Sequence, residues 1–127
     1  MTRIFREICF VTSYFGDIKK IDIAENFKKH DNFDYFCFTN IEKKYFNNTS
    51  WNIITVDLDR YKIDYKNNVL LSRYFKFRVY KYLKNVLNRS YKIIFHCDCY
   101  FSPKYEVNWD HISRRLESSK FGIVQFV

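Results

Sequence analysis

The chain has 127 residues and a formal charge of +8, with 14 Phe and 11 Tyr but only two Gly and one Pro. With 47% hydrophobic and 28% charged residues it is too apolar for a disordered segment and too short for two ordinary domains, so we expect one globular domain. The basic residues are scattered singly and in pairs and form no long block. AT-rich codons alone favour Lys, Asn, Ile, Tyr and Phe, so the charge argues little for nucleic-acid binding.

The first half of the chain alternates apolar runs with polar connections. Residues 8–12 form an apolar run that predicts a buried strand, and residues 21–30 carry apolar side chains at near-helical spacing, which predicts a short helix. Residues 34–39 and 51–56 are rich in aromatic and β-branched residues and predict two more strands. The polar stretch between these two strands is expected to contain a turn.

The second half begins with residues 57–70, which lack clean periodicity and predict a loop. Across residues 71–88 apolar side chains recur every three or four positions, which predicts the strongest helix of the chain. Strands are expected at 91–95 and 121–127, with a helix at 109–119 between them. This order of elements is typical of an α/β fold with flanking helices and a mainly parallel sheet.

The sequence carries no signal for a membrane span or for secretion. No run approaches the ~18 apolar residues that a membrane span requires, and Arg3, Arg6 and Glu7 interrupt the N-terminal apolar stretch, unlike a signal peptide. We therefore expect a cytoplasmic protein whose four cysteines are small buried side chains or reduced thiols.

Polar side chains follow three of the predicted strands. Ligands of open α/β sheets bind beyond the carboxyl ends of the strands, so these residues are the first candidates for a site. The alternative for the pair after the second strand is an ordinary strand-end turn. The candidates are Thr12, Tyr14, Gly16, Thr39, Asn40, His96 and Asp98.

His96 and Asp98 directly follow an apolar strand, a place where a carboxylate can hold a divalent ion. Mg²⁺ and Mn²⁺ prefer oxygen ligands and share them with substrate phosphates, and an imidazole suits Mn²⁺ better. The alternative is that Asp98 only caps a turn. A zinc site of His96, Cys97 and Cys99 with a distant His30 or His111 is disfavoured, because neighbouring strand residues point to opposite faces.

Arg73 and Lys76 lie at the start of the predicted strong helix. There the two cations and the free backbone N–H groups can receive an anionic phosphate. The alternative is a solvated helix face, the usual position of Lys and Arg. A Cys/His hydrolase has no support, because no nucleophile turn of the GxSxG kind is present.

Four segments, taken in order, resemble a known family. They are VTSYFGD at 11–17, DYFCFTN at 34–40 followed by Trp51 and Ile53, SRYFK at 72–76, and YKIIFHCD at 91–98. Each is weak alone, but their order and gaps together are similar to those of the TOD/MUCI-type glycosyltransferase-like domain, a relative of the GT-A nucleotide-sugar transferases. The resemblance covers residues 8–127.

This resemblance implies a GT-A fold with a Rossmann-like first portion. The first strand end, Thr39 and Asn40 would approach the nucleotide base and ribose, and Arg73 and Lys76 would lie near the sugar-nucleotide. It also implies transfer of a hexose from a UDP- or GDP-sugar to a glycan acceptor, with Mn²⁺ or Mg²⁺ stabilising the departing diphosphate.

The chain departs from the family pattern at the metal element. Without a gap, Asp98 takes the first acid of a D-x-D or D-x-N element, Cys99 replaces its Gly, and Tyr100 stands at the last ligand. With a shift of two residues, His96 becomes the first ligand and Asp98 the last. In both alignments one expected ligand is replaced.

The chain is also short for this family, whose members continue beyond the strand that matches residues 121–127. We therefore expect a single domain, 1–127, that is incomplete at its C-terminus. The alternative to a sugar transferase is a noncatalytic binding or assembly module, associating with itself or with a complementing chain through apolar surface left uncovered.

Overall fold

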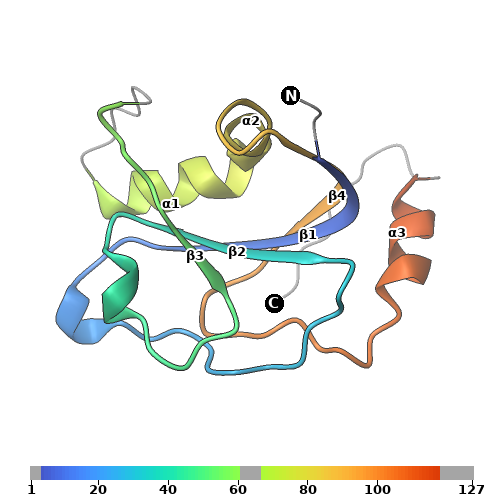
Figure 1. Cartoon of the computed structure of the whole chain (residues 1–127), viewed down its shortest axis with the longest axis horizontal. Helices are drawn as coiled ribbons and strands as arrows, with labels where there is room; N and C mark the ends of the chain where they lie inside the picture. Colours follow the sequence, from blue (N-terminus) through green and yellow to red (C-terminus); the bar gives the residue numbers. More distant parts are fainter. Residues whose placement is uncertain (1–3, 61–66, 118–127) are drawn as a thin grey trace.

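The computed structural model describes residues 4–60 and 67–117. In these ranges the chain forms a four-stranded sheet with helices packed against it (Figure 1). The strands are β1 (Ile4–Tyr14), β2 (Asp34–Thr39), β3 (Asn52–Thr55) and β4 (Arg89–His96). The helices are α1 (Asn68–Phe77), α2 (Val79–Asn85) and α3 (Trp109–Glu117), and the 3₁₀ turns are η1 (Ile18–Lys20) and η2 (Lys43–Tyr45).

All four strands are parallel, in the order β3-β2-β1-β4. β1 therefore lies between β2 and β4, with Val11 opposite Phe36 on one side and His96 on the other. The predicted α/β fold with a mainly parallel sheet is confirmed, and the strands predicted at 8–12, 34–39, 51–56 and 91–95 are all present.

The strands are continuous apolar runs because both faces of the sheet are covered. Along β1, Cys9 and Val11 belong to one hydrophobic cluster, while Ile8 and Phe10 belong to another on the opposite face. All four side chains are at most 1% exposed. A strand buried on both faces needs apolar residues at every position and not only at alternate ones.

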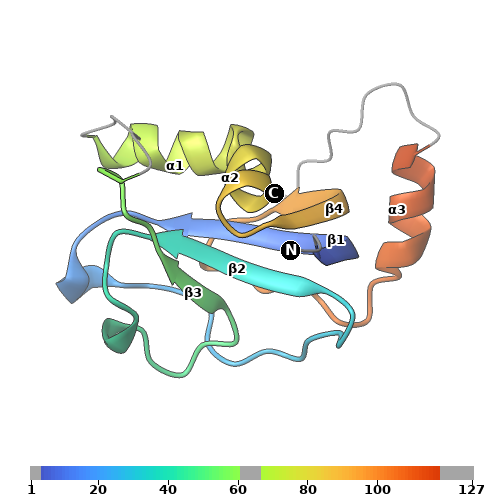
Figure 2. The same ribbon diagram turned by 45° about the horizontal axis from the view of Figure 1, so that its top comes forward.

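The first covering layer is made by α1 and α2, which lie on one side of the sheet (Figure 2). Phe75 of α1 stacks on Phe38 of β2, with ring centroids 5.0 Å apart, and on Phe15 at 5.5 Å. Leu71 contributes to the same cluster from one turn earlier in α1. These contacts fix α1 above the carboxyl end of the sheet.

The second covering layer is made by α3, by the two tryptophans and by the extended segment 21–33, which runs along the other side of the sheet (Figure 2). The Phe10 ring meets Trp109 edge-on at 4.8 Å and stacks on Phe95 at 5.3 Å. The Trp109 indole also donates a hydrogen bond to the carbonyl of Lys104, at 2.9 Å. This one side chain thus attaches the start of α3 to the sheet.

The helix predicted at residues 21–30 is wrong, because this segment is extended and contains no helix. Its backbone groups are bonded to distant parts of the chain instead of to each other. The Ala24 N–H donates to the Cys99 carbonyl at 2.7 Å, and the Phe27 N–H donates to the Ser50 hydroxyl at 2.8 Å. The apolar side chains of the segment still face the core, as the pattern indicated.

The helix predicted at residues 71–88 is present but interrupted. Arg78, with φ −122° and ψ 11°, separates α1 from α2, and the two helices run in different directions (Figure 1). The break allows α1 to pack on β1 while α2 packs on β4. The helical region also begins earlier than predicted, at Asn68, because the Asn67 side chain accepts a hydrogen bond from the Val69 N–H at 2.7 Å and caps the helix.

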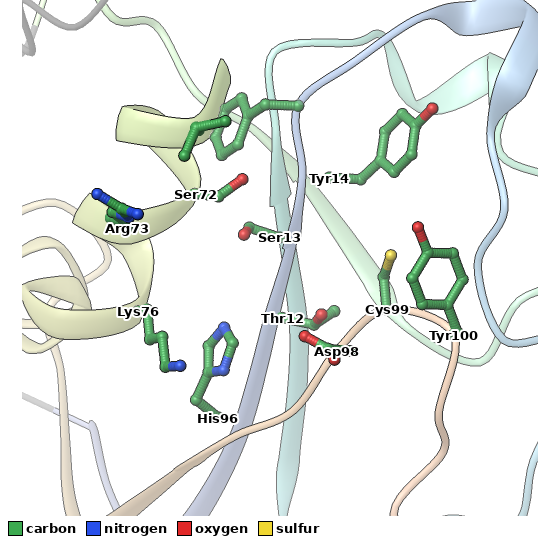
Figure 3. A pocket seen from close by; sticks show the side chains of 12 residues that line it. Thr12, Ser13, Tyr14, Ser72, Arg73, Lys76, His96, Asp98, Cys99 and Tyr100 are labelled. Carbon is green, nitrogen blue, oxygen red and sulfur yellow. The ribbon is translucent and has the colours of Figure 1, made fainter. Parts of the chain in front are cut away.

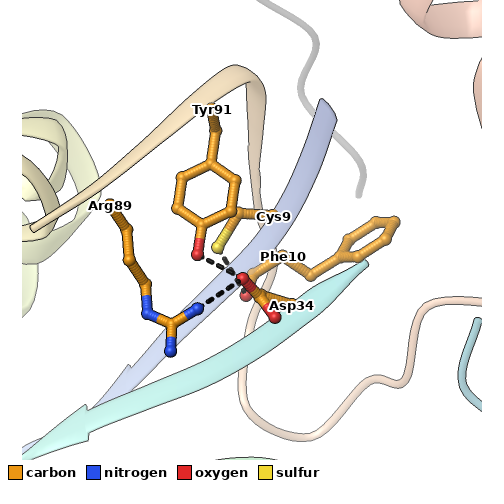
Figure 4. Close-up of polar contacts among 5 residues, drawn as sticks. All are labelled: Cys9, Phe10, Asp34, Arg89 and Tyr91. Carbon is orange, nitrogen blue, oxygen red and sulfur yellow. Dashed lines mark hydrogen bonds and ion pairs between the residues drawn. The ribbon is translucent and has the colours of Figure 1, made fainter. Parts of the chain in front are cut away.

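A polar cluster fastens β2 to β4 across β1 (Figure 4). Asp34, the first residue of β2, accepts hydrogen bonds from the Tyr91 hydroxyl at 2.5 Å and from the Arg89 guanidinium at 3.3 Å. Burial, together with the neighbouring Cys9 and the Asp34 carboxylate, raises the pKa of Tyr91, so the phenol stays protonated and donates. The cluster lies at the amino end of β2, away from the carboxyl ends of the strands.

The last predicted helix, 109–119, is observed as α3 up to Glu117, and the strand predicted at 121–127 lies outside the described residues. None of the helices in the described ranges is long and apolar enough to cross a membrane.

Candidate functional site

A cleft of about 320 Å³ opens at the carboxyl ends of β1 and β4 (Figure 3). β1 has a neighbour on each side there, and this is the position where open α/β sheets bind ligands. Three parts of the chain line it: the end of β1, one face of α1, and the segment that follows β4. The lining residues are Thr12, Ser13, Tyr14, Phe15, Val69, Ser72, Arg73, Lys76, His96, Asp98, Cys99 and Tyr100.

The wall formed by α1 is cationic. Arg73 and Lys76 are both exposed and lie on the side of the helix that faces the cleft (Figure 3). The opposite side of α1 is held by the buried Leu71 and Phe75, so the two cations are presented from a fixed helix. Both cations therefore line the cleft, but the prediction that they lie at the start of the helix is wrong. α1 begins at Asn68, so Arg73 lies in its middle and Lys76 in its last turn, and the free N–H groups of the first turn belong to earlier residues.

His96 and Asp98 line the middle of the cleft, opposite α1 (Figure 3). Burial and then the nearby Lys76 ammonium lower the pKa of His96 to about 4, with Asp98 acting in the opposite direction. The imidazole is therefore neutral at neutral pH, a form that can either accept or donate a hydrogen bond. Asp98 itself is exposed.

Thr12 lies at the floor of the cleft and is only 1% exposed. Its Oγ1 has no hydrogen-bond partner within the part of the chain that is described. A buried hydroxyl without a partner costs free energy, so such groups in folded proteins call for a specific explanation. A ligand in the cleft would supply one.

Tyr14 and Tyr100 form the wall away from α1 (Figure 3). The Tyr14 hydroxyl donates to the Asp17 carbonyl at 2.9 Å, and its ring meets Phe46 edge-on. Gly16 does not line the cleft but lies against this tyrosine, since a Cβ at Gly16 would come within 3.2 Å of the hydroxyl. Gly16 thus leaves space for the Tyr14 ring.

Thr39 and Asn40 are not part of the cleft. Thr39 is fully buried, and its Oγ1 accepts a hydrogen bond from the Ile41 N–H at 3.1 Å, while Asn40 is exposed. This geometry matches the alternative weighed for the pair, a strand-end turn.

The described residues do not by themselves make a metal site. Among residues 4–60 and 67–117 no three His, Cys, Asp or Glu side chains are arranged to hold a metal ion. His96 and Asp98 offer two donors in a cleft that also contains the cations Arg73 and Lys76. This donor set fits a divalent ion poorly, because Asp98 is the only charged oxygen ligand among the described lining residues and Arg73 and Lys76 repel a cation.

Cys97 and Cys99 lack the chemistry of a nucleophile, and within the described residues they belong to no group of three side chains arranged to hold a metal ion. Burial raises the pKa of Cys97 to about 12 and that of Cys99 to about 11, so both are protonated thiols at neutral pH. His30, the distant ligand considered with them, stacks on Tyr105 with ring centroids 4.1 Å apart.

The predicted site residues did not include several residues of the cleft, among them Ser13, Ser72 and Tyr100, and Tyr100 was considered only as a replacement in the metal element. One signal for Ser72 was present, because Val69, Ser72 and Lys76 lie three and four positions apart and therefore share one helix face. Tyr100 had no signal of this kind, since it lies on an irregular segment.

Comparison of the chain with family models, with curated proteins and with solved structures gives no match.

Proposed function

We propose that the cleft binds a nucleotide-sugar, a UDP- or GDP-hexose, and that the chain is a glycosyltransferase-like domain of GT-A type. One observation carries this proposal: a cleft at the carboxyl ends of β1 and β4 has the cations Arg73 and Lys76 on one side and Tyr14 and Tyr100 on the other. A ligand with an anionic part and an aromatic part fits a cleft that has one cationic wall and one aromatic wall. The parallel sheet agrees with the fold that the ordered sequence motifs imply.

The two walls suggest how such a ligand would lie. The diphosphate would approach Arg73 and Lys76, because charge-assisted hydrogen bonds to phosphate oxygens are the strongest that these side chains make. The base would lie near Tyr14 and Tyr100, since aromatic rings stack on the flat faces of bases. The unpartnered Thr12 hydroxyl on the floor would contact the middle of the ligand.

In a transfer reaction, the bond between the anomeric carbon and the diphosphate breaks, and the electron pair leaves with the phosphate oxygen. The acceptor oxygen forms the new bond to the anomeric carbon, and its proton would pass to the Asp98 carboxylate or to the departing diphosphate. The role of Arg73 and Lys76 would be to stabilise the negative charge that grows on the leaving diphosphate. Among the described residues that line the cleft, Asp98 is the only carboxylate.

Calorimetric titration of the full chain with UDP and GDP in the presence of Mn²⁺ tests the proposal. We expect saturable binding of at least one of the two, and at least about tenfold weaker binding by the Arg73→Ala/Lys76→Ala double variant. The matched control is Lys81→Ala/Lys84→Ala, which removes two exposed cations of α2 outside the cleft. Absence of binding by the unaltered chain would contradict the proposal.

A second candidate is a module that binds the nucleotide-sugar without transferring the sugar. It is favoured by the lining of the cleft, in which the described residues supply two cations for binding but only one carboxylate for proton transfer. Incubation with radiolabelled UDP-hexose and a mixture of glycan acceptors separates the candidates. Labelled product, or slow release of free hexose, supports a transferase, whereas binding without either supports the module.

A further inference from the structure

The cleft combines two features that bear on how a diphosphate would be held. The first is the small number of metal ligands, since the described lining residues include one imidazole, His96, and one carboxylate, Asp98. The second is the position of Lys76, whose ammonium group points across the cleft toward His96 (Figure 3). A cation of the protein therefore already lies beside His96, one of the two candidate metal ligands.

A divalent ion at this place would meet like charge from the α1 wall of the cleft. Lys76 faces His96 from α1, and Arg73 lies one turn earlier on the same helix wall. The only opposing charge among the lining side chains of the described residues is Asp98, which is exposed and solvated. Repulsion between close like charges grows as water is displaced, so a ligand that closes the cleft would strengthen it.

The same arrangement of cations can bind an anionic ligand without a metal ion. A diphosphate entering the cleft would meet one guanidinium and one ammonium, with five and three N–H donors respectively, directed from a helix that is anchored by Leu71 and Phe75. The neutral His96 imidazole could donate a further hydrogen bond through its ring N–H without first taking up a proton. Two positive charges of this kind equal the formal charge of one Mg²⁺ or Mn²⁺.

We propose that the positive charges of Lys76 and Arg73 neutralise the diphosphate in place of a divalent cation. The cleft would then bind a nucleoside diphosphate without a metal ion. This rests on the proposed function, because it concerns the same ligand in the same cleft. It departs from the metal dependence implied by the family resemblance. Lys76 is here a binding residue that faces the phosphates, and Asp98 is not a metal ligand.

The test is a pair of calorimetric titrations of the full chain with UDP and GDP, one in excess EDTA and one with Mn²⁺. We expect dissociation constants that agree within about twofold, a difference well below 1 kcal/mol. Binding that occurs only with Mn²⁺ would overturn the inference while leaving the proposed function intact. Absence of binding in both titrations would instead contradict the proposed function.

Two variants make the assignment specific to Lys76. In EDTA, Lys76→Gln should weaken binding at least about tenfold, whereas Lys76→Arg, which keeps the charge, should largely retain it. Lys81→Gln, an exposed position on α2, is the matched control and should bind as the unaltered chain does. Equal binding by Lys76→Gln and the control would overturn the inference.

A titration with Mn²⁺ alone completes the test. We expect no saturable binding at millimolar concentration. Saturable binding that is lost in Asp98→Asn would show that Asp98 holds a metal after all, and the proposal would be wrong.

Discussion

Two buried threonines of this protein differ in one respect. Thr12 and Thr39 are both at most 1% exposed, but the Thr39 Oγ1 accepts a hydrogen bond from the Ile41 N–H and the Thr12 Oγ1 has no partner in the described ranges. Replacing each by valine keeps the shape of the side chain and removes only the hydroxyl. The pair therefore separates a hydroxyl that forms a hydrogen bond within the fold from one that forms none among the described residues.

We expect Thr12→Val to leave the free energy of unfolding unchanged or to raise it by up to about 1 kcal/mol, because an unsatisfied buried hydroxyl is removed. Thr39→Val should lower it by about 1–3 kcal/mol, because the Ile41 N–H loses its acceptor. Urea denaturation measures both. In nucleotide titrations Thr12→Val should bind more weakly, and unaltered affinity would show that Thr12 does not contact the ligand.

His96 makes stability depend on pH. Its pKa of about 4 in the folded chain lies below the ordinary value of 6.5, so the unfolded chain takes up a proton at a higher pH than the folded chain does. The contribution of His96 to the free energy of unfolding is therefore fully present above about pH 6.5. It is lost as the pH falls toward 4, which lowers the free energy of unfolding by at most about 3 kcal/mol. His96→Gln should flatten this part of the profile in urea denaturation. A parallel loss in the variant would assign the effect to other groups.

At the scale of single residues, the sequence pointed to several side chains that the structure brings together in one cleft, while their role in binding stays a prediction. Arg73, Lys76, His96 and Asp98 were predicted site residues, and all line the cleft. Thr39 failed, because a polar residue that follows a strand looks the same whether it faces a ligand or bonds to its own turn.

At the scale of elements, the cluster of Asp34, Arg89 and Tyr91 joins the first residue of β2 to β4 across β1. Tyr91→Phe should lower the free energy of unfolding by about 1–3 kcal/mol, because a partly buried carboxylate loses a short hydrogen bond. Tyr45→Phe is the control, since Tyr45 is 43% exposed and should be neutral. Equal stability of the two variants would show that the Arg89 contact alone is sufficient.

The cap of α1 affects both stability and the cleft. Asn67→Ala should cost about 1 kcal/mol, because the Val69 N–H loses its acceptor, whereas Asn67→Ser, another good cap, should cost much less. Thermal unfolding followed by circular dichroism measures the difference. Because α1 carries Arg73 and Lys76, the alanine variant should also bind nucleotide more weakly than the serine variant.

The elements show why some segments were predictable and others not. The strand at 34–39 was predicted with its observed bounds, because its pattern depends only on burial of adjacent residues. The segment 21–30 was assigned as a helix on local spacing, but its backbone partners are Thr49, Ser50 and Cys99. A hydrogen-bond partner so distant in the sequence leaves no signal in the local pattern of residues. The break between α1 and α2 at Arg78 leaves none either.

At the scale of the whole molecule, the two covering layers share one sheet, and neighbouring residues of β1 belong to different layers. Both tryptophans, Trp51 and Trp109, are buried in the second layer, while α1 and α2 belong to the first. We expect tryptophan fluorescence and far-ultraviolet circular dichroism to report the same urea midpoint, as a two-state transition requires. Separate midpoints would show that the layers unfold independently.

The position of β1 in the sheet has a consequence for how the chain is made. Cys9 is paired with both Asp34 and Ile94, so during synthesis β1 must wait for β4, which is made much later, before it gains its second neighbour. Until then β1 and β2 expose an apolar edge, a state that favours aggregation. Because contacts so distant in sequence slow folding, we expect refolding in milliseconds to seconds, in the range of proteins dominated by non-local strand pairing.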